Sequence, residues 1–265
     1  MRFRHSVLPV ALAFSAFPVI AQDLSQRDPR AVDVLTQAVG AAGGLGRVRD
    51  IQDFKASGTI TYYWADEEVH GAVTMRGRGT RHFRLDAILP TGERSWAVSD
   101  GEGSLRDDKG NTTAIPYHNA VNLGSLTFPL VHLAFALEEH SLSVEYLGLT
   151  TRDDRATHHF RMRQLSGRGS EAEDHDIAKL TSREYFIDAI TLQLVSSVDM
   201  VYPQRDPSNG HPREILFADY RSIDGVLVPF SITETVARQR TWTIQLNEIS
   251  FNTGLQDIDF EVTKN

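Results

Sequence analysis

The sequence predicts an α+β fold in which a strongly curved antiparallel sheet of about ten or eleven strands forms a half-barrel, with helices packed on its concave face. The clearest signal lies in the last third of the chain, where apolar residues alternate with polar ones and so share one face of each expected strand. These apolar sets are Ile190-Leu192-Leu194, Ile215-Phe217, Val226-Val228-Phe230-Ile232 and Trp242-Ile244-Leu246. Asp224-Gly225 suits a tight hairpin turn between two of these strands. The change of phase between Leu246 and Ile249 indicates a β-bulge at Asn247-Glu248, which helps a wide sheet to curl.

Earlier segments supply a helix and the first strands of the sheet. Asp28-Pro29 opens the helix, because Asp accepts hydrogen bonds from first-turn amides and proline fits the first helical position, and Gly43-Gly44 ends it. From Phe54 to Leu105 we expect about four or five strands joined by short turns, which is the pattern of an antiparallel meander. Their apolar residues are Ile60, Tyr62 and Trp64, then Val69, Val73 and Met75, then Phe83 and Leu85, then Trp96 and Val98.

The segment from Asn119 to Leu137 interrupts the strand pattern. It is almost uncharged and rich in Leu, Val and Phe, and Pro129 starts or kinks its helical part. A helix that is apolar on nearly all sides is buried on two sides, so we expect it against the concave face of the sheet. We predict that residues Leu123 to Leu137 form a lid that moves aside to admit a ligand.

Strands resume at Leu142–Leu149 and at Thr157–Gln164. The polar stretch from Ser166 to Asp176 follows, and its Gly, Ser and acidic residues favour a loop. A second loop is expected from Pro203 to Pro212.

Residues 1–21 are typical of a secretory signal peptide. Arg2 and Arg4 precede an apolar stretch, and Val19-Ile20-Ala21 resembles the small-residue pattern of a cleavage site. We expect residues 22–265 to form a single domain in the bacterial periplasm, with an extracellular destination or an uncleaved N-terminal anchor as the alternatives. The chain has no cysteine, which excludes structural disulfides, thiolate chemistry and a lipid-modified N-terminal cysteine.

The charge balance is acidic, with 27 Lys and Arg residues against 35 Asp and Glu residues and a formal net charge of −8. Such a balance argues against nucleic acid as a partner and against broad adhesion to anionic membranes.

Catalytic and metal-binding patterns are weak throughout. No nucleophile elbow, phosphate loop, dinucleotide glycine pattern or zinc-protease motif occurs, and Ser125 after Gly124 lacks the strand-to-helix context of an elbow. Adjacent His158 and His159 point to opposite faces of a strand, so they do not chelate one ion together. The acidic run around His175 lacks calcium-loop spacing and favours a solvated loop. We therefore expect no enzyme activity, no catalytic residue, no metal and no cofactor.

The chain resembles the LolA/LolB-like carriers that sort lipoproteins to the bacterial outer membrane. Four features carry this resemblance: Gly43-Gly44-Leu45 after the first helix, the apolar mid-chain helix, Tyr185-Phe186-Ile187-Asp188, and the hairpin from Tyr220 to Phe230. The resemblance implies a curved sheet wrapped around helices, with acyl chains or lipid-like groups carried inside. Typical carriers of this type are shorter, and the two polar loops are additions to their pattern. The implied partners are a lipid or acylated protein ligand and a membrane-bound donor or acceptor protein, and we expect a monomer.

Ten bulky apolar side chains are the candidate lining of a ligand cavity. They are Trp64, Phe83, Trp96, Phe128, Leu130, Phe135, Phe160, Phe186, Phe230 and Trp242. Such a set either fills the half-barrel as a plain core or leaves room for a ligand. The first expectation is therefore a periplasmic carrier or sensor of lipid-like molecules. The alternative is a non-catalytic structural or regulatory interaction protein with a packed core.

Overall fold

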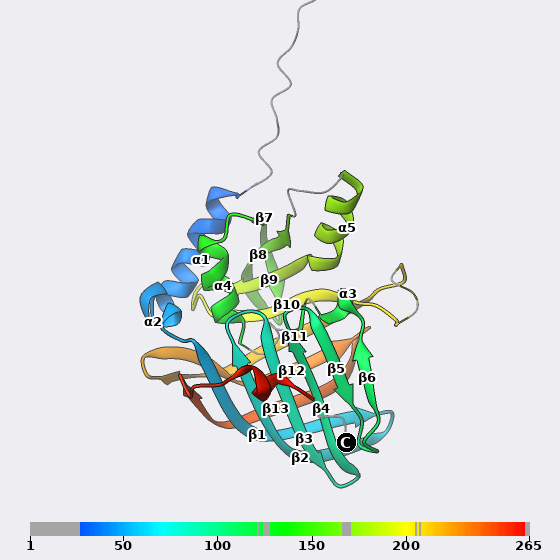
Figure 1. The fold of residues 1–265 in the computed structure, drawn as a ribbon. Coiled ribbons are helices and arrows are strands. Elements are labelled where there is room, and N and C mark those ends of the chain that lie inside the picture. Colours follow the sequence, from blue (N-terminus) through cyan, green and yellow to red (C-terminus); the bar gives the residue numbers. More distant parts are fainter. Residues whose placement is uncertain are drawn as a thin grey trace, which may run out of the picture.

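The computed structural model describes residues 27–120, 122–123, 128–165, 171–204, 206 and 208–262, with the backbone alone for residues 171–174. Figure 1 shows one antiparallel sheet that curves around itself, with helices gathered at one end. The strands are β1 (Asp53–Trp64), β2 (Glu67–Arg78), β3 (His82–Leu89), β4 (Gly92–Ser99), β5 (Glu102–Arg106), β6 (Thr112–Ile115), β7 (Leu142–Arg152), β8 (Arg155–Gln164), β9 (Arg183–Asp188), β10 (Leu194–Val201), β11 (His211–Ile223), β12 (Val226–Val236) and β13 (Gln239–Phe251). The helices are α1 (Pro29–Ala41), α2 (Leu45–Arg49), α3 (Tyr117–Ala120), α4 (Pro129–Glu138), α5 (Glu171–Thr181) and the 3₁₀ helix η2 (Asp257–Phe260).

Two meanders make up the sheet. Its order is β6-β5-β4-β3-β2-β1-β13-β12-β11-β10-β9-β8-β7, so the first and last strands of the chain pair at the centre. β6 and β7 are the two edges, and the sheet is not closed. The α+β half-barrel is therefore confirmed, with 13 strands among the described residues instead of ten or eleven. The short strands β5 and β6 account for part of the difference, because their half-exposed residues lack the alternation that marks a buried strand.

The predicted bulge and hairpin turn are confirmed. Ser57 pairs with Glu248 while Gly58 pairs with Leu246, which leaves Asn247 as the extra residue of the bulge. In the turn between β11 and β12, Asp224 and Gly225 have φ values of +50° and +80°. Two successive positive φ values match the twist of a two-residue hairpin.

Helix α1 begins and packs as its sequence predicts. The Asp28 carboxylate accepts a hydrogen bond from the Arg30 amide at 2.8 Å, and Pro29 occupies the first turn. The apolar side of α1, which includes Leu35, is buried in the same core as the concave face of the sheet. α1, α2 and α4 contact one another, and Figure 1 shows them side by side above the strands.

Two local predictions are wrong. Ile190-Leu192-Leu194 is not a strand, because Ile190 is 89% exposed and Leu192 has a φ of +59°. The Asp188 carboxylate accepts hydrogen bonds from the amides of Ile190 and Thr191, both at 2.8 Å, and this turns the chain before β10 begins at Leu194.

The acidic part of the predicted loop from Ser166 to Asp176 is also different. Residues 166–170 lie outside the described part, but Glu171–Thr181 form helix α5. Glu, Ala, Lys and Leu are strong helix formers, so the segment is polar without being irregular.

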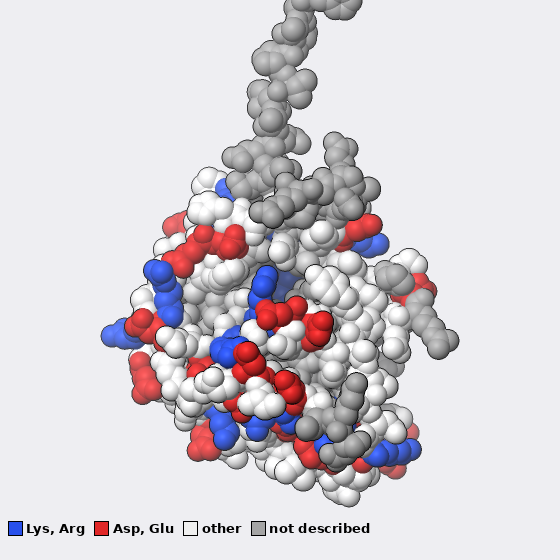
Figure 2. All heavy atoms as spheres, viewed as in Figure 1, with Lys and Arg blue, Asp and Glu red and all other residues white. Residues whose placement is uncertain are grey.

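Figure 2 shows the charged side chains on one face of the molecule. Acidic and basic groups are interspersed there and are not gathered into a field of one sign. Among the described residues, no helix is both long and apolar enough to cross a membrane.

Candidate functional site

The ten apolar residues of the predicted cavity do not share one environment. Phe83, Phe128, Phe160 and Phe230 are buried in the core. Phe186 lies on the opposite, convex face, because it alternates with the core residues Tyr185 and Ile187 along β9. The ring of His159 stacks on it at 4.3 Å and the Arg152 guanidinium covers it at 4.1 Å, so Phe186 does not line the concave side.

The space between α1, α4 and the β11–β12 hairpin is almost filled. Leu130 of α4 borders a cavity of only about 30 Å³, which lies between α1, α4 and the β11–β12 hairpin. Phe128 packs against Phe54 and Phe251, with ring centroids 5.2 and 5.7 Å apart. The middle of the half-barrel is therefore a side-chain core.

An open aromatic cleft lies at another place in the half-barrel. Its volume is about 370 Å³, and all three tryptophans of the chain, Trp64, Trp96 and Trp242, line it. The rest of the wall consists of Tyr62, Tyr63, Arg94, Leu105, Ile115, Leu123, Glu234 and Thr241. We call this site the aromatic cleft. Its volume falls in the range of about 300 to 1,000 Å³ that is usual for small-molecule sites.

The curl of the sheet brings the walls of the aromatic cleft together. Tyr62 of β1 pairs directly with Trp242 of β13, and Trp96 of β4 pairs with Leu105 of β5. β4 is separated from β1 by β3 and β2, so a flat sheet would hold these two pairs apart. The alternation along each strand, which the sequence sets, turns these side chains inward. The two pairs come close together only because the sheet is curved.

Arg94 is the half-buried cation of the cleft. Its guanidinium lies 5.4 Å from the ring centre of Tyr62 and 5.8 Å from that of Trp64, and these two rings stack on each other at 5.6 Å. Burial raises the pKa of Tyr62 to about 12, so this phenol stays neutral at physiological pH. Trp64 is 36% exposed and lies at the solvent side of the cleft, whereas Tyr62 is only 6% exposed.

Glu234 is the carboxyl group of the cleft wall, and it is engaged by protein groups. Thr241 Oγ1 donates a hydrogen bond to Glu234 Oε1 at 2.5 Å, and the Arg213 guanidinium lies 3.9 Å from Glu234 Oε2. Burial raises the pKa of Glu234 above its ordinary value, although the charge of Arg213 opposes that change.

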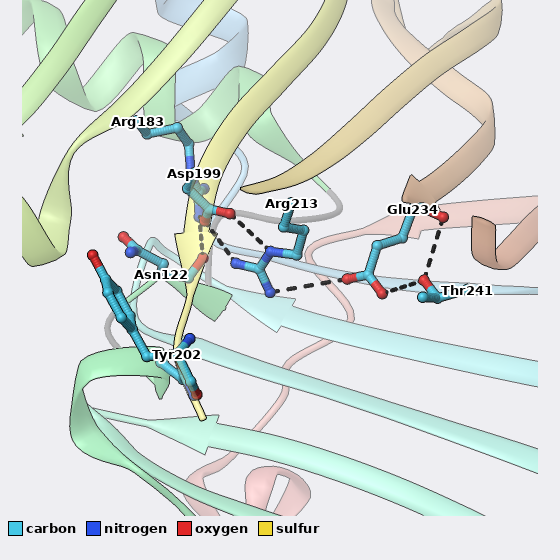
Figure 3. A network of polar contacts seen from close by, with 8 residues as sticks. Asn122, Arg183, Asp199, Tyr202, Arg213, Glu234 and Thr241 are labelled. Carbon is cyan, nitrogen blue, oxygen red and sulfur yellow. Dashed lines mark hydrogen bonds and ion pairs between the residues drawn. The ribbon is translucent and has the colours of Figure 1, made fainter. Parts of the chain in front are cut away.

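A buried polar row leads away from Glu234 across the concave face, as Figure 3 shows. The row takes one residue from each of five adjacent strands: Arg183 of β9, Asp199 of β10, Arg213 of β11, Glu234 of β12 and Thr241 of β13. The Asp199 carboxylate accepts hydrogen bonds from Arg183 at 2.5 Å and from Arg213 at 2.8 and 2.6 Å. Arg183 also donates to the carbonyl oxygen of Asn122 at 2.5 Å.

The far end of the polar row borders a second cleft of about 270 Å³. Arg183, His132 and Phe135 lie in its wall, and Phe135 is 41% exposed. Burial, with the Arg183 charge adding to it, lowers the pKa of His132 to about 3, so this imidazole is neutral near pH 7.

Sequence reasoning missed Arg94 and the polar row. A signal was present, because Arg213 has the same phase as Ile215 and Phe217, and Glu234 continues the inward series of β12. Charged residues in an inward phase mark a buried ionic group, whereas the predicted cavity lining contains apolar residues alone.

The adjacent histidines of β8, His158 and His159, have ordinary partners. The His158 ring nitrogen Nδ1 lies 3.0 Å from the Tyr146 hydroxyl on one face, and His159 Nε2 lies 2.8 Å from Glu184 on the other. Within the described ranges, no group of three or more His, Cys, Asp or Glu residues could hold a metal ion.

No family model and no curated protein sequence matches the chain, but solved structures match it in fold. An outer membrane lipoprotein-sorting protein domain from Vibrio parahaemolyticus is 10% identical, with a TM-score of 0.51 over 87% of this chain and 96% of that one. A LolA superfamily protein from Nitrosomonas europaea is 8% identical, with a TM-score of 0.53 over 87% and 97%. A DUF1329 family protein from Desulfovibrio piger is 10% identical, with a TM-score of 0.53 over 89% and 98%. The chain therefore has a LolA-like fold.

Proposed function

We propose that the protein is a non-enzymatic, periplasmic carrier that binds an acyl-bearing molecule in the aromatic cleft, after residues 1–21 have served as a cleaved export signal. The observation that carries this proposal is an open site of about 370 Å³ that gathers every tryptophan of the chain on the concave side. The LolA-like fold supports it, since two of the matching structures are named for lipoprotein sorting or for the LolA superfamily.

The driving force would be burial of hydrocarbon. Each methylene removed from water contributes about 0.8 kcal/mol, so a chain of about a dozen carbons is held well even when only part of it is covered. The wall offers aromatic faces together with Leu105, Ile115 and Leu123, which is the surface that a flexible alkyl chain needs.

Residues Leu123 to Leu137 remain the proposed lid. Leu123 lies in the cleft wall, and the same segment leads to α4, which begins at Pro129; residues 124–127 lie outside the described part. Movement of this lid would carry Leu123 away from the wall and widen the cleft. A membrane-bound donor or acceptor would act by favouring the open form.

One observation favours the other candidate function, that of an interaction protein with a packed core. Beneath the helices, the cavity next to Leu130 holds only about 30 Å³, too little for an acyl chain. The two candidates differ in the aromatic cleft, which an interaction protein of this kind would not load with lipid.

Native mass spectrometry of protein prepared without detergent, followed by solvent extraction, tests the proposal. The variant Leu105→Glu puts a negative charge into the apolar wall of the cleft, and Ile88→Glu is the matched control, because Ile88 is 66% exposed and lies outside the cleft wall. We expect adducts of lipid mass on the wild type and on Ile88→Glu, and their loss on Leu105→Glu. A clean apo mass for the wild type, with no change in tryptophan fluorescence when laurate is added, would overturn the carrier function.

A further inference from the structure

The cation of the aromatic cleft has no carboxylate to neutralise it. Within the described residues, Arg94 is in no ion pair, and its guanidinium is held only by the faces of Tyr62 and Trp64. Neighbouring arginines of the same part of the sheet differ: Arg76 and Arg84 pair with Asp86 at 2.7 and 2.9 Å, and Arg106 lies 3.9 Å from Glu93.

Glu234, the only carboxyl group in the described cleft wall, forms no ion pair with Arg94. The Glu234 carboxylate accepts a hydrogen bond from the Thr241 hydroxyl and lies next to Arg213 of the polar row. The cleft therefore presents an unpaired guanidinium near its solvent side, although the whole chain carries a net charge of −8. This local positive charge is a property of the site and not of the protein's overall field.

The Arg94 guanidinium lies over two rings and is in no ion pair of the described residues, so its N–H donors are available. A guanidinium that lies over an aromatic ring is held by its face, while its N–H groups point outward from its edge. Those N–H groups match the two oxygens of a carboxylate or a phosphate, and such charge-assisted pairs are the strong ones. The rings also remove much of the conformational freedom that a free arginine would lose on binding.

The wall changes in polarity from one part to another. Arg94 is half-buried and lies over Tyr62 and Trp64, which are 6% and 36% exposed. Trp64 is thus the exposed member of the wall, whereas Trp96, Trp242 and Leu123 are 9, 6 and 8% exposed. An amphiphile would therefore place its polar end at Arg94 and its hydrocarbon among the deeper side chains.

We propose that Arg94 binds the anionic headgroup, a carboxylate or a phosphate, of a single-chain amphiphile whose hydrocarbon lies in the aromatic cleft. This inference rests on the proposed function. It specifies that the ligand is anionic and that Arg94 is the residue that recognises its headgroup. Neutral and cationic amphiphiles with the same chain bind less well, because they leave the guanidinium desolvated without a partner.

The test compares four probes with one dodecyl-length chain, each below its critical micelle concentration: laurate, dodecyl phosphate, 1-monolauroylglycerol and dodecyltrimethylammonium. Binding is measured by calorimetry and by the fluorescence of the three tryptophans. We expect the better anion to bind about tenfold or more tightly than the neutral glyceride, a difference that one charged hydrogen-bond pair supplies. A preference for laurate identifies a fatty-acid-like ligand, and a preference for dodecyl phosphate identifies a phosphate headgroup.

Variants assign the selectivity to a residue. Arg94→Gln should bring the anion-to-neutral ratio close to one while glyceride binding persists, and Arg94→Lys should keep part of the ratio because the charge remains. Arg30→Gln is the matched control, since the Arg30 guanidinium also lies over a tyrosine ring, that of Tyr146 at 4.6 Å, but outside the cleft wall. The control should keep the wild-type ratio.

The outcomes separate this inference from the function on which it rests. Equal binding of anionic and neutral probes to the wild type, or an unchanged ratio in Arg94→Gln, overturns the headgroup assignment and leaves the carrier function standing. Failure of all four probes to bind overturns the carrier function, and the assignment of Arg94 with it.

Discussion

Asp199 and Arg213 lie directly opposite each other on β10 and β11, and two hydrogen bonds of 2.8 and 2.6 Å join the carboxylate to the guanidinium. Both side chains are at most 4% exposed, so neither charge is compensated by water. Arg183 adds a third charge to the same carboxylate. Removal of Asp199 would leave two buried cations without their shared partner.

Asp199→Ala should therefore lower the free energy of unfolding by about 3 to 5 kcal/mol, the usual cost of breaking a buried ion pair from one side. Urea denaturation at neutral pH measures the change. Arg49→Ala is the control, because the Arg49–Glu138 pair is 60% and 43% exposed and such pairs contribute less than about 1 kcal/mol. Equal losses in the two variants would show that the row contributes nothing beyond a surface pair.

The Asp199 carboxylate should also make the free energy of unfolding depend on pH in the acidic range. Burial alone would raise the pKa of Asp199, but the charges of Arg213 and Arg183 outweigh it and hold the pKa below its ordinary value of 3.8. A lowered folded pKa gives stability that is fully present above 3.8 and is lost as the pH falls through the folded value. Urea midpoints of the wild type and Asp199→Asn should thus converge as the pH falls below 3.8, and a constant gap would contradict the assignment.

Glu234 should show the opposite sign. Burial raises its folded pKa above the ordinary value of 4.5, so the wild type loses stability as the pH rises from 4.5 through the folded value. Glu234→Gln lacks this ionisation, and its stability relative to the wild type should increase over that interval. Urea unfolding at a series of pH values tests the sign. A free energy of unfolding of Glu234→Gln that falls relative to the wild type as the pH rises would contradict it.

The fold was largely predictable from local patterns, whereas only the three tryptophans of the aromatic cleft were predicted among its wall residues. Asp28, Asp224-Gly225 and the phase change at Asn247 are local signals, because a cap, a turn and a bulge each involve a few neighbouring residues. The aromatic cleft joins Trp96 to Trp242 through curvature, and no short segment encodes that meeting. Arg94 reads in the sequence as an ordinary surface cation, since only the folded sheet brings its side chain onto Tyr62 and Trp64.

Two features that carried the resemblance in sequence meet in the structure. Gly43, after helix α1, has a φ of +131°, and a Cβ atom at that position would lie 2.5 Å from the carbonyl oxygen of Gly225 in the β11–β12 turn. The Leu227 amide donates a hydrogen bond to the Ala42 carbonyl at 2.8 Å beside this contact. The end of the helix is thus seated on the hairpin backbone, with no space for a side chain.

Gly43→Ala should lower the free energy of unfolding by at least about 1 kcal/mol, because the new methyl group is strained by the backbone angle and meets backbone atoms that have little freedom to move. Gly40→Ala is the matched control, since Gly40 lies within α1 and a Cβ there meets nothing within 4 Å. That change should stabilise the protein by about 0.5 to 1 kcal/mol through helix propensity. Thermal or urea unfolding of both variants gives the two signs, and a Gly43→Ala protein as stable as the wild type would show that α1 does not need this close seat on the hairpin.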